Sequence, residues 1–280
     1  MNAAKQLPFQ VFKFHPKSEA RVNQAAIIVS DRWTRYMALS MTNADLHIRC
    51  FKSGGMSTLD DESDLMKKTG ALTVVPDLYK GKVGVNAEEA SHLMNGLDWR
   101  TAMRELDTLV AQLREAKYTK LGSIGFCMGG GLSLALAEHL SGTSHPLKAA
   151  VTCYGTPPKD IFDVREIAKV TPVQGHFGGK DTMEGLSDPA TVDALEFNLQ
   201  NAPNRRADVE IYRYPELGHA FLNDEAWSVK MRKELGMVDK SKDTIQEEED
   251  DRLKAWNRIT QFFVSNFDPN LGEQVGSSSL

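Results

Sequence analysis

Six short apolar runs constrain the fold of this 280-residue chain more than any other feature of its sequence. Unbroken apolar runs of this length are typical of β-strands that are covered on both faces. The sequence therefore favours a sheet that is buried on both sides. The six runs are Ala25–Val29, Leu72–Val75, Leu121–Phe126, Ala149–Tyr154, Val173–Phe177 and Val209–Tyr214.

Helical patterns lie between these runs. In Trp99–Ala116, apolar residues recur at spacings of three and four, which places them on one face of a helix. Further helices are predicted over Met128–Leu140, Pro189–Gln200 and Asp243–Phe267, and the aromatic residues of 9–14 suggest an antiparallel edge strand. Strands that alternate with helices indicate an α/β fold: a mostly parallel central sheet, right-handed crossovers and helices on both faces.

The domain organisation follows from where the alternation of strands and helices ends or is interrupted. We predict a single domain over residues 1–270 and a disordered tail over 271–280. Residues 31–63 have no clear period and are interpreted as an irregular insertion, within which Leu46–Phe51 could form a short strand. Residues 222–242 carry apolar side chains among charges, a pattern that fits a cap segment over a pocket.

Composition excludes several classes of function. The chain has 33 Lys and Arg against 38 Asp and Glu, a net charge of −5 that disfavours nucleic-acid binding. Its three cysteines make neither a disulfide framework nor a zinc pattern, which favours a reducing, cytoplasmic location. We expect no targeting segment and no membrane partner. The glycines around residue 125 do not form a dinucleotide-binding motif, so we expect no cofactor and no metal.

The sharpest chemical signal is Gly125-Phe126-Cys127-Met128-Gly129, which stands between a predicted strand and a predicted helix. This context is typical of a nucleophile elbow, in which the nucleophile occupies a tight turn and small residues flank it. The turn would expose Cys127 and direct the backbone N–H of Met128 at a developing oxyanion. A cysteine without partners would more often be a small buried apolar residue.

Partners for Cys127 occur in the order expected of a hydrolase. Asp181 follows the run Val173–Phe177, and His219 follows Val209–Tyr214. Because the carboxyl ends of parallel strands meet at one edge of the sheet, the three side chains are expected to lie near one another. His219 would act as general base and then acid, and Asp181 would orient its ring.

These segments resemble the dienelactone hydrolase (carboxymethylenebutenolidase-like) family of α/β-hydrolases over about residues 64–267. The resemblance implies the α/β-hydrolase fold, a Cys127–Asp181–His219 triad and hydrolysis of a small ester or lactone through a covalent acyl-enzyme, without a cofactor. We expect a small-molecule substrate and a monomer or homodimer. The matching segments are Ile124–Gly130, Pro76-Asp77-Leu78-Tyr79, Gly178-Gly179-Lys180-Asp181 and Gly218-His219-Ala220-Phe221.

The resemblance also assigns roles near the first parallel strand. It places the second oxyanion donor near Asp31-Arg32-Trp33, which makes the N–H of Arg32 a candidate. It aligns Asp31 with a position where the family usually has Glu beside the resting thiol. Aromatic side chains could line an acyl or aromatic pocket, although core packing is equally plausible for each. They are Trp33, Tyr36, Tyr79, Tyr154 and Trp227.

The substrate of this chain is expected to differ from dienelactone. Family members that act on dienelactone grip its carboxylate with arginines, one of which lies four residues after the histidine, where this chain has Asn223. An amide does not replace a bidentate guanidinium. Another anion contact could come from Arg32, Arg35, Lys80 or Lys82, but ordinary surface charge is the better interpretation.

Two rival functions remain open from the sequence. The chain could be a catalytically degraded relative that binds a ligand or partner, as the altered region around Asp31 suggests. It could also be a redox-responsive protein that uses the Cys127 thiol, although no resolving cysteine lies nearby in sequence. Cys153 is expected to be inert and buried, and His176 to be a residue of the core or of the surroundings of the site.

Overall fold

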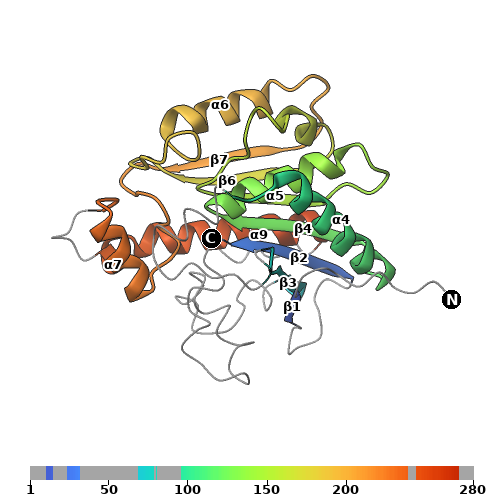
Figure 1. Ribbon diagram of the computed structural model, residues 1–280, viewed down its shortest axis with the longest axis horizontal. Coiled ribbons are helices and arrows are strands. Elements are labelled where there is room, and N and C mark those ends of the chain that lie inside the picture. The colour runs from blue at the N-terminus through green and yellow to red at the C-terminus, as the bar shows by residue number, and fades with distance from the viewer. Residues whose placement is uncertain are drawn as a thin grey trace.

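The structure is a computed structural model that describes residues 11–14, 24–31, 69–78, 80, 96–238 and 244–270. A seven-stranded sheet in the order β1-β3-β2-β4-β5-β6-β7 forms its centre (Figure 1). Strands β2 to β7 are parallel, and β1 pairs antiparallel with β3 at one edge, as the sequence predicts. The strands are β1 (Val11–Phe14), β2 (Ala25–Asp31), β3 (Leu72–Pro76), β4 (Lys120–Phe126), β5 (Ala149–Cys153), β6 (Val173–Gly178) and β7 (Val209–Tyr214).

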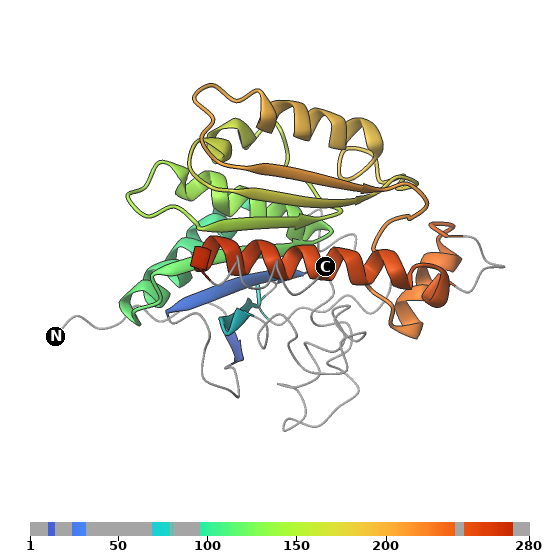
Figure 2. The same cartoon turned by 180° about the vertical axis from the view of Figure 1, so that it is seen from behind.

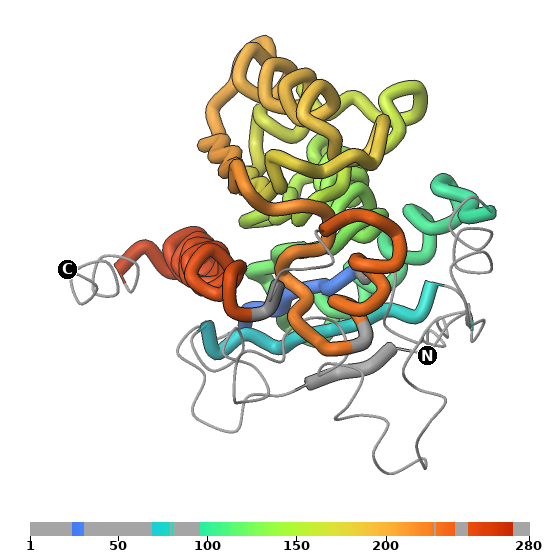
Figure 3. The backbone as a smooth tube through the Cα atoms, turned by 90° about the vertical axis from the view of Figure 1, so that its left-hand side faces the viewer, coloured from blue at the N-terminus to red at the C-terminus, as the bar shows by residue number. Residues whose placement is uncertain are grey.

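Helices cover both faces of the sheet. In Figure 2, helix α9 crosses the face of the sheet that is turned toward the viewer. Figure 3 shows α9 on the opposite side of the strands from α4 and α5. The α/β fold with helices on both faces is thus confirmed. The helices are α4 (Trp99–Glu115), α5 (Met128–Ser141), η2 (a 3₁₀ helix, Val164–Lys169), α6 (Pro189–Gln200), α7 (Ala226–Glu234), α8 (Thr244–Glu247) and α9 (Glu249–Phe267).

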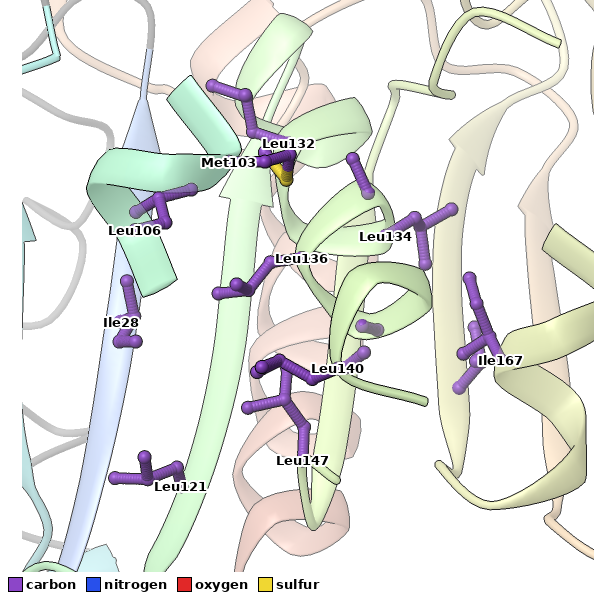
Figure 4. Packing of buried hydrophobic residues seen from close by; sticks show 14 of the residues in the cluster. Ile28, Met103, Leu106, Leu121, Leu132, Leu134, Leu136, Leu140, Leu147 and Ile167 are labelled. Carbon is purple, nitrogen blue, oxygen red and sulfur yellow. The ribbon is translucent and has the colours of Figure 1, made fainter. Parts of the chain in front are cut away.

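The two faces of the sheet carry two separate apolar clusters. Ile28 of β2 packs with Leu106 of α4 and Leu136 of α5 in the cluster drawn in Figure 4. Ile27 and Ile124 point to the opposite face and join the cluster that contains side chains of α9. Burial on both faces explains why β2 to β6 read as largely apolar runs rather than as alternating ones. The expectation was wrong for Val209–Tyr214, because β7 is an edge strand and most of its residues are partly or fully exposed.

The last predicted helix is wrong in one respect, because Asp243–Phe267 is not a single helix. The structure ends α8 at Glu247 and begins α9 at Glu249. The side chain of Glu248 is buried and accepts hydrogen bonds from Arg232 of α7 at 3.0 and 3.1 Å. We attribute the break to this interaction, which ties Glu248 to another element.

Several expectations fall outside the described residues. They concern the strand at Leu46–Phe51, nearly all of the insertion at 31–63 and the tail at 271–280. Helix η2, whose first turn is capped by Asp163, was not predicted from the sequence. Within the described ranges, every helix is too short or too polar to cross a membrane.

Candidate active site

The turn between β4 and α5 has the geometry of a nucleophile elbow. Cys127 has φ 55° and ψ −126°, a left-handed conformation that an L-residue adopts only when its surroundings enforce it. Its N–H donates to the carbonyl of Cys153 at 3.0 Å, and its own carbonyl accepts from Gly130 at 2.8 Å. A Cβ atom at Gly125 would lie 1.8 Å from the carbonyl oxygen of Gly129, so only glycine fits there.

The end of β5 supports the same turn, a role that was not predicted from the sequence. Tyr154 follows β5 with φ 43°, and Gly155 comes next. A Cβ atom on Gly155 would lie 1.7 Å from the carbonyl oxygen of Cys127. The only signal in the sequence is a glycine shortly after a buried strand, which is too common to indicate this role.

The loops after β6 and β7 bring Asp181 and His219 to the elbow. The Nε2 atom of His219 lies 3.2 Å from the Sγ atom of Cys127. Its Nδ1 atom lies 2.7 Å from Oδ2 of Asp181. Both side chains are buried. One imidazole ring therefore joins a thiol and a carboxylate, as the order of the three residues along the chain predicted.

Asp181 and Ser187 hold the other side of the ring. Oδ1 of Asp181 accepts a hydrogen bond from the N–H of Met183 at 3.0 Å, which fixes the carboxylate. The hydroxyl oxygen of Ser187, fully buried, lies 3.2 Å from Nδ1 of His219. Ser187 was not predicted, because no motif marks it and only the fold of its loop brings it to the histidine.

The charge state of the ring follows from these neighbours. Burial by itself lowers the pKa of His219. The charge of the Cys127 sulfur and the hydrogen bonds to Asp181 and Cys127 outweigh burial and raise that pKa to about 9. At neutral pH the ring is thus an imidazolium that faces sulfur through Nε2 and the carboxylate through Nδ1.

Tyr154 forms an aromatic wall of the site. Its ring meets the His219 ring edge-on, with centroids 5.2 Å apart, and meets Phe221 at 5.7 Å. Only 3% of Tyr154 is exposed. Of the two interpretations left open for Tyr154, the packing role is the one seen here.

Other predicted site residues are placed as follows. Met128 is buried at the first position of α5, directly after Cys127. The side-chain oxygen of Asn223 accepts a hydrogen bond from the backbone N–H of Glu225 at 3.1 Å. The backbone carbonyl of Asn223 accepts one from the side chain of Arg232 at 3.2 Å. The backbone of Asp31 pairs with Phe126, beside the elbow. The side chain of Asp31 lies outside the described residues, as do Arg32, Trp33, Tyr36 and Tyr79, and the side chain of Trp227.

His176 and Cys153 are core residues, as predicted. Both are fully buried. His176 lies 2.9 Å from the hydroxyl of Tyr214 and 2.9 Å from the side chain of Gln174. Burial lowers the pKa of His176 to about 3, so its ring is neutral. Burial also raises the pKa of the Cys153 thiol, which is therefore not a reactive thiolate.

One candidate anion contact is already paired. Lys80, a candidate anion contact, forms an ion pair with Glu105 at 2.7 Å. Among the described residues, no three His, Cys, Asp or Glu side chains converge as metal ligands would.

The sheet, the elbow and the joined side chains define an α/β-hydrolase. The model of the dienelactone hydrolase family matches residues 53–267, and the chain belongs to that family. This membership makes it a hydrolase, of the class that acts on carboxylic ester and lactone bonds.

Individual relatives agree with this assignment. A Yersinia pestis protein described as "Putative carboxymethylenebutenolidase" is 34% identical over 175 residues, which are 57% of this chain and 61% of that protein. The carboxymethylenebutenolidase of Rhodococcus opacus is 28% identical over 170 residues, 56% of this chain and 62% of its own length. The "Putative Dienelactone Hydrolase" structure of Klebsiella pneumoniae has a TM-score of 0.57 at 20% identity and covers 92% of this chain and 95% of its own.

Proposed function

We propose that this chain hydrolyses a small ester or lactone with Cys127 as nucleophile, His219 as general base and acid, and Asp181 as the group that orients the histidine. One observation carries the proposal: a single buried imidazole lies 3.2 Å from a thiol sulfur and 2.7 Å from a carboxylate oxygen. Such a chain of contacts activates a nucleophile that is weak by itself.

Acylation is the first half of the reaction. The thiol proton resides on Nε2 of His219, as the raised pKa of about 9 favours, and the sulfur attacks the carbonyl carbon. The carbonyl π electrons move to oxygen. When the tetrahedral species collapses, the bond to the leaving alkoxide breaks, and Nε2 donates its proton to that oxygen. An acyl group remains on Cys127 as a thioester.

Deacylation uses the same groups in reverse. Nε2 of His219, now neutral, takes a proton from water, and the hydroxide formed attacks the thioester carbonyl. Collapse breaks the carbon–sulfur bond and releases the carboxylic acid. The carboxylate of Asp181 stabilises the imidazolium in both steps because it accepts the Nδ1 hydrogen bond throughout.

Backbone N–H groups would stabilise the oxyanion. The N–H of Met128 is the first candidate, because Met128 directly follows the nucleophile at the start of α5. The N–H of Arg32, in the segment after β2, is the second candidate. The pairing of Asp31 with Phe126 supports it, since the end of β2 lies next to the end of β4.

We propose that dienelactone itself is a poor substrate. Asn223 occupies the position where the family resemblance expects a carboxylate-binding arginine, and the oxygen of its side chain is already bonded to Glu225. Lys80 is paired with Glu105. We expect the efficiency for dienelactone to be below that for an uncharged ester, as measured by kcat/KM on the two.

The test compares the two buried cysteines. Hydrolysis of p-nitrophenyl acetate is measured for the wild type, Cys127→Ala, His219→Ala and the matched control Cys153→Ala. Activity should persist only in the wild type and Cys153→Ala, and mass spectrometry of the quenched wild type should show one acetyl group on Cys127. Equal rates in all four proteins would refute the proposal, and activity without acetylation would refute the acyl-enzyme.

We also propose a reducing, cytoplasmic location. Neither Cys127 nor Cys153 forms a disulfide in the structure, and the proposed chemistry requires Cys127 to stay reduced. Fractionation of cells that express the tagged chain should recover it with cytoplasmic markers, and recovery in an oxidising compartment would contradict this.

A further inference from the structure

A cavity of about 1220 Å³ lies next to the candidate active site. Its two sides are the stretch of 156–165, which follows β5, and the stretch of 183–198, which includes the first part of α6. Met128, the residue after the nucleophile, contributes to its lining. The volume exceeds that of a typical small-molecule site, which is roughly 300–1,000 Å³.

The inner surface of the cavity is largely apolar. Met128, Phe162 and Leu195 are buried side chains that line it, and Trp99 meets Phe162 edge-on with ring centroids 5.7 Å apart. On the α6 side, exposed lining positions 190 and 194 are alanines one helical turn apart. Small side chains on that wall leave room for a ligand.

The charges around the cavity do not suit an anion. Its lining contains two cations, Lys159 and Arg165, and three carboxylates, Asp160, Asp163 and Glu184. Arg165 already makes two side-chain hydrogen bonds to Asp163, at 2.8 and 2.7 Å. The surplus of negative charge opposes a carboxylate ligand, and the apolar inner surface favours an uncharged group over a cation.

One short loop belongs both to the triad and to the cavity. Asp181 and Ser187 contact His219, and residues 183–186 between them line the cavity. On the opposite side, Thr156 lines the cavity and bonds through its hydroxyl to the carbonyl of Leu186 at 2.9 Å. The cavity therefore shares a wall with the catalytic groups.

We propose that this cavity binds an extended, uncharged, apolar acyl group of the ester substrate while the carbonyl is held at Cys127. The inference rests on the proposed function and adds a substrate class to it: esters of medium-length apolar acids rather than small anionic lactones. Each methylene that enters an apolar cavity should improve kcat/KM by about three- to fourfold.

The test fills the cavity and varies the acyl chain. Rates with p-nitrophenyl acetate and p-nitrophenyl octanoate are compared for the wild type, Ala194→Trp and the control Gln200→Trp, which places the same side chain on α6 outside the cavity lining. The wild type should prefer octanoate by at least about tenfold in kcat/KM. Ala194→Trp should lose that preference, and Gln200→Trp should retain it.

Two outcomes would overturn the inference: no octanoate preference in the wild type, or an unchanged preference in Ala194→Trp. If circular dichroism shows Ala194→Trp to be unfolded, Asn198→Trp, at another exposed lining position, replaces it. Failure of the proposed function is seen separately, because acetate hydrolysis would then not depend on Cys127.

Discussion

The hydroxyl oxygen of Ser187 lies 3.2 Å from Nδ1 of His219, the ring nitrogen that also lies 2.7 Å from Asp181. Because Nε2 faces the sulfur of Cys127, the Nδ1 proton is the one directed at this pair of acceptors. The carboxylate of Asp181 accepts the Nδ1 hydrogen bond at 2.7 Å, and the hydroxyl of Ser187 accepts it at 3.2 Å. Ser187 is thus placed as a positioning residue, which acts through the histidine.

Replacing Ser187 by alanine should therefore weaken the hold on the ring. We expect kcat for p-nitrophenyl acetate to fall about fivefold, as the loss of one buried hydrogen bond of roughly 1 kcal/mol implies. The pKa of His219 should also fall, which a pH titration of thiolate absorbance measures. Ser133→Ala is the control, since Ser133 is a buried serine bonded to Ser123 at 2.8 Å. Identical pH titrations for the two variants would contradict the role.

Gly155→Ala should disturb the elbow from a neighbouring strand end. The added Cβ would lie 1.7 Å from the carbonyl oxygen of Cys127, so the backbone must move. We expect a loss of about 2–4 kcal/mol in the free energy of unfolding, measured in urea, together with most of the esterase activity. Gly142→Ala is the matched control, because a Cβ there meets nothing within 4 Å. Equal stability of the two variants would disprove the clash.

His176 should make the fold sensitive to acid. Its pKa is lowered from 6.5 to about 3 in the folded state, so the unfolded chain binds the proton more readily. The stability that the neutral ring supports is present above pH 6.5 and is lost as pH falls toward 3. His219 does not interfere: its contribution is fully present below pH 6.5 and is lost only as pH rises through about 9.

The measurement is urea unfolding of the wild type and His176→Gln at several pH values from neutral to acid. The wild type should lose more stability than the variant below pH 6.5, while the carboxylates common to both cancel in the comparison. Parallel curves for the two proteins would show that His176 does not titrate in this way.

Arg232 should be costly to remove from its buried ion pair. It donates to Glu248 at 3.0–3.1 Å and to the carbonyl of Asn223 at 3.2 Å, which links α7, the start of α9 and the loop after His219. Arg232→Met would leave a buried carboxylate without this partner and should cost about 3–5 kcal/mol in the free energy of unfolding. Lys230→Met, in an exposed pair with Glu234, should cost less than about 1 kcal/mol. Similar losses in both would contradict the argument.

Much of the fold could be predicted because its signals are local. A strand buried on both faces is largely apolar, so β2 to β6 could each be located to within two residues. The break at Glu248 could not be predicted, since its partner Arg232 is sixteen residues earlier and the segment by itself continues a helical pattern.

The residues of the candidate site could likewise be predicted only where the sequence carries a local signal for them. Asp181 and His219 could be proposed because each follows a parallel strand, and parallel topology brings such ends together. Ser187 and Gly155 could not, because their roles depend on distances to His219 and Cys127 that no spacing in the sequence encodes.

The unusual backbone at Cys127 has a consequence for the choice of nucleophile. The turn packs main chain against main chain: Gly125 lies against the carbonyl of Gly129, and Gly155 lies against the carbonyl of Cys127. None of these approaches involves the sulfur. A hydroxyl side chain would thus be presented by the same turn at the same place. The choice between thiol and alcohol chemistry therefore depends on one atom of the side chain at position 127. The backbone that positions this atom would be the same for sulfur and for oxygen.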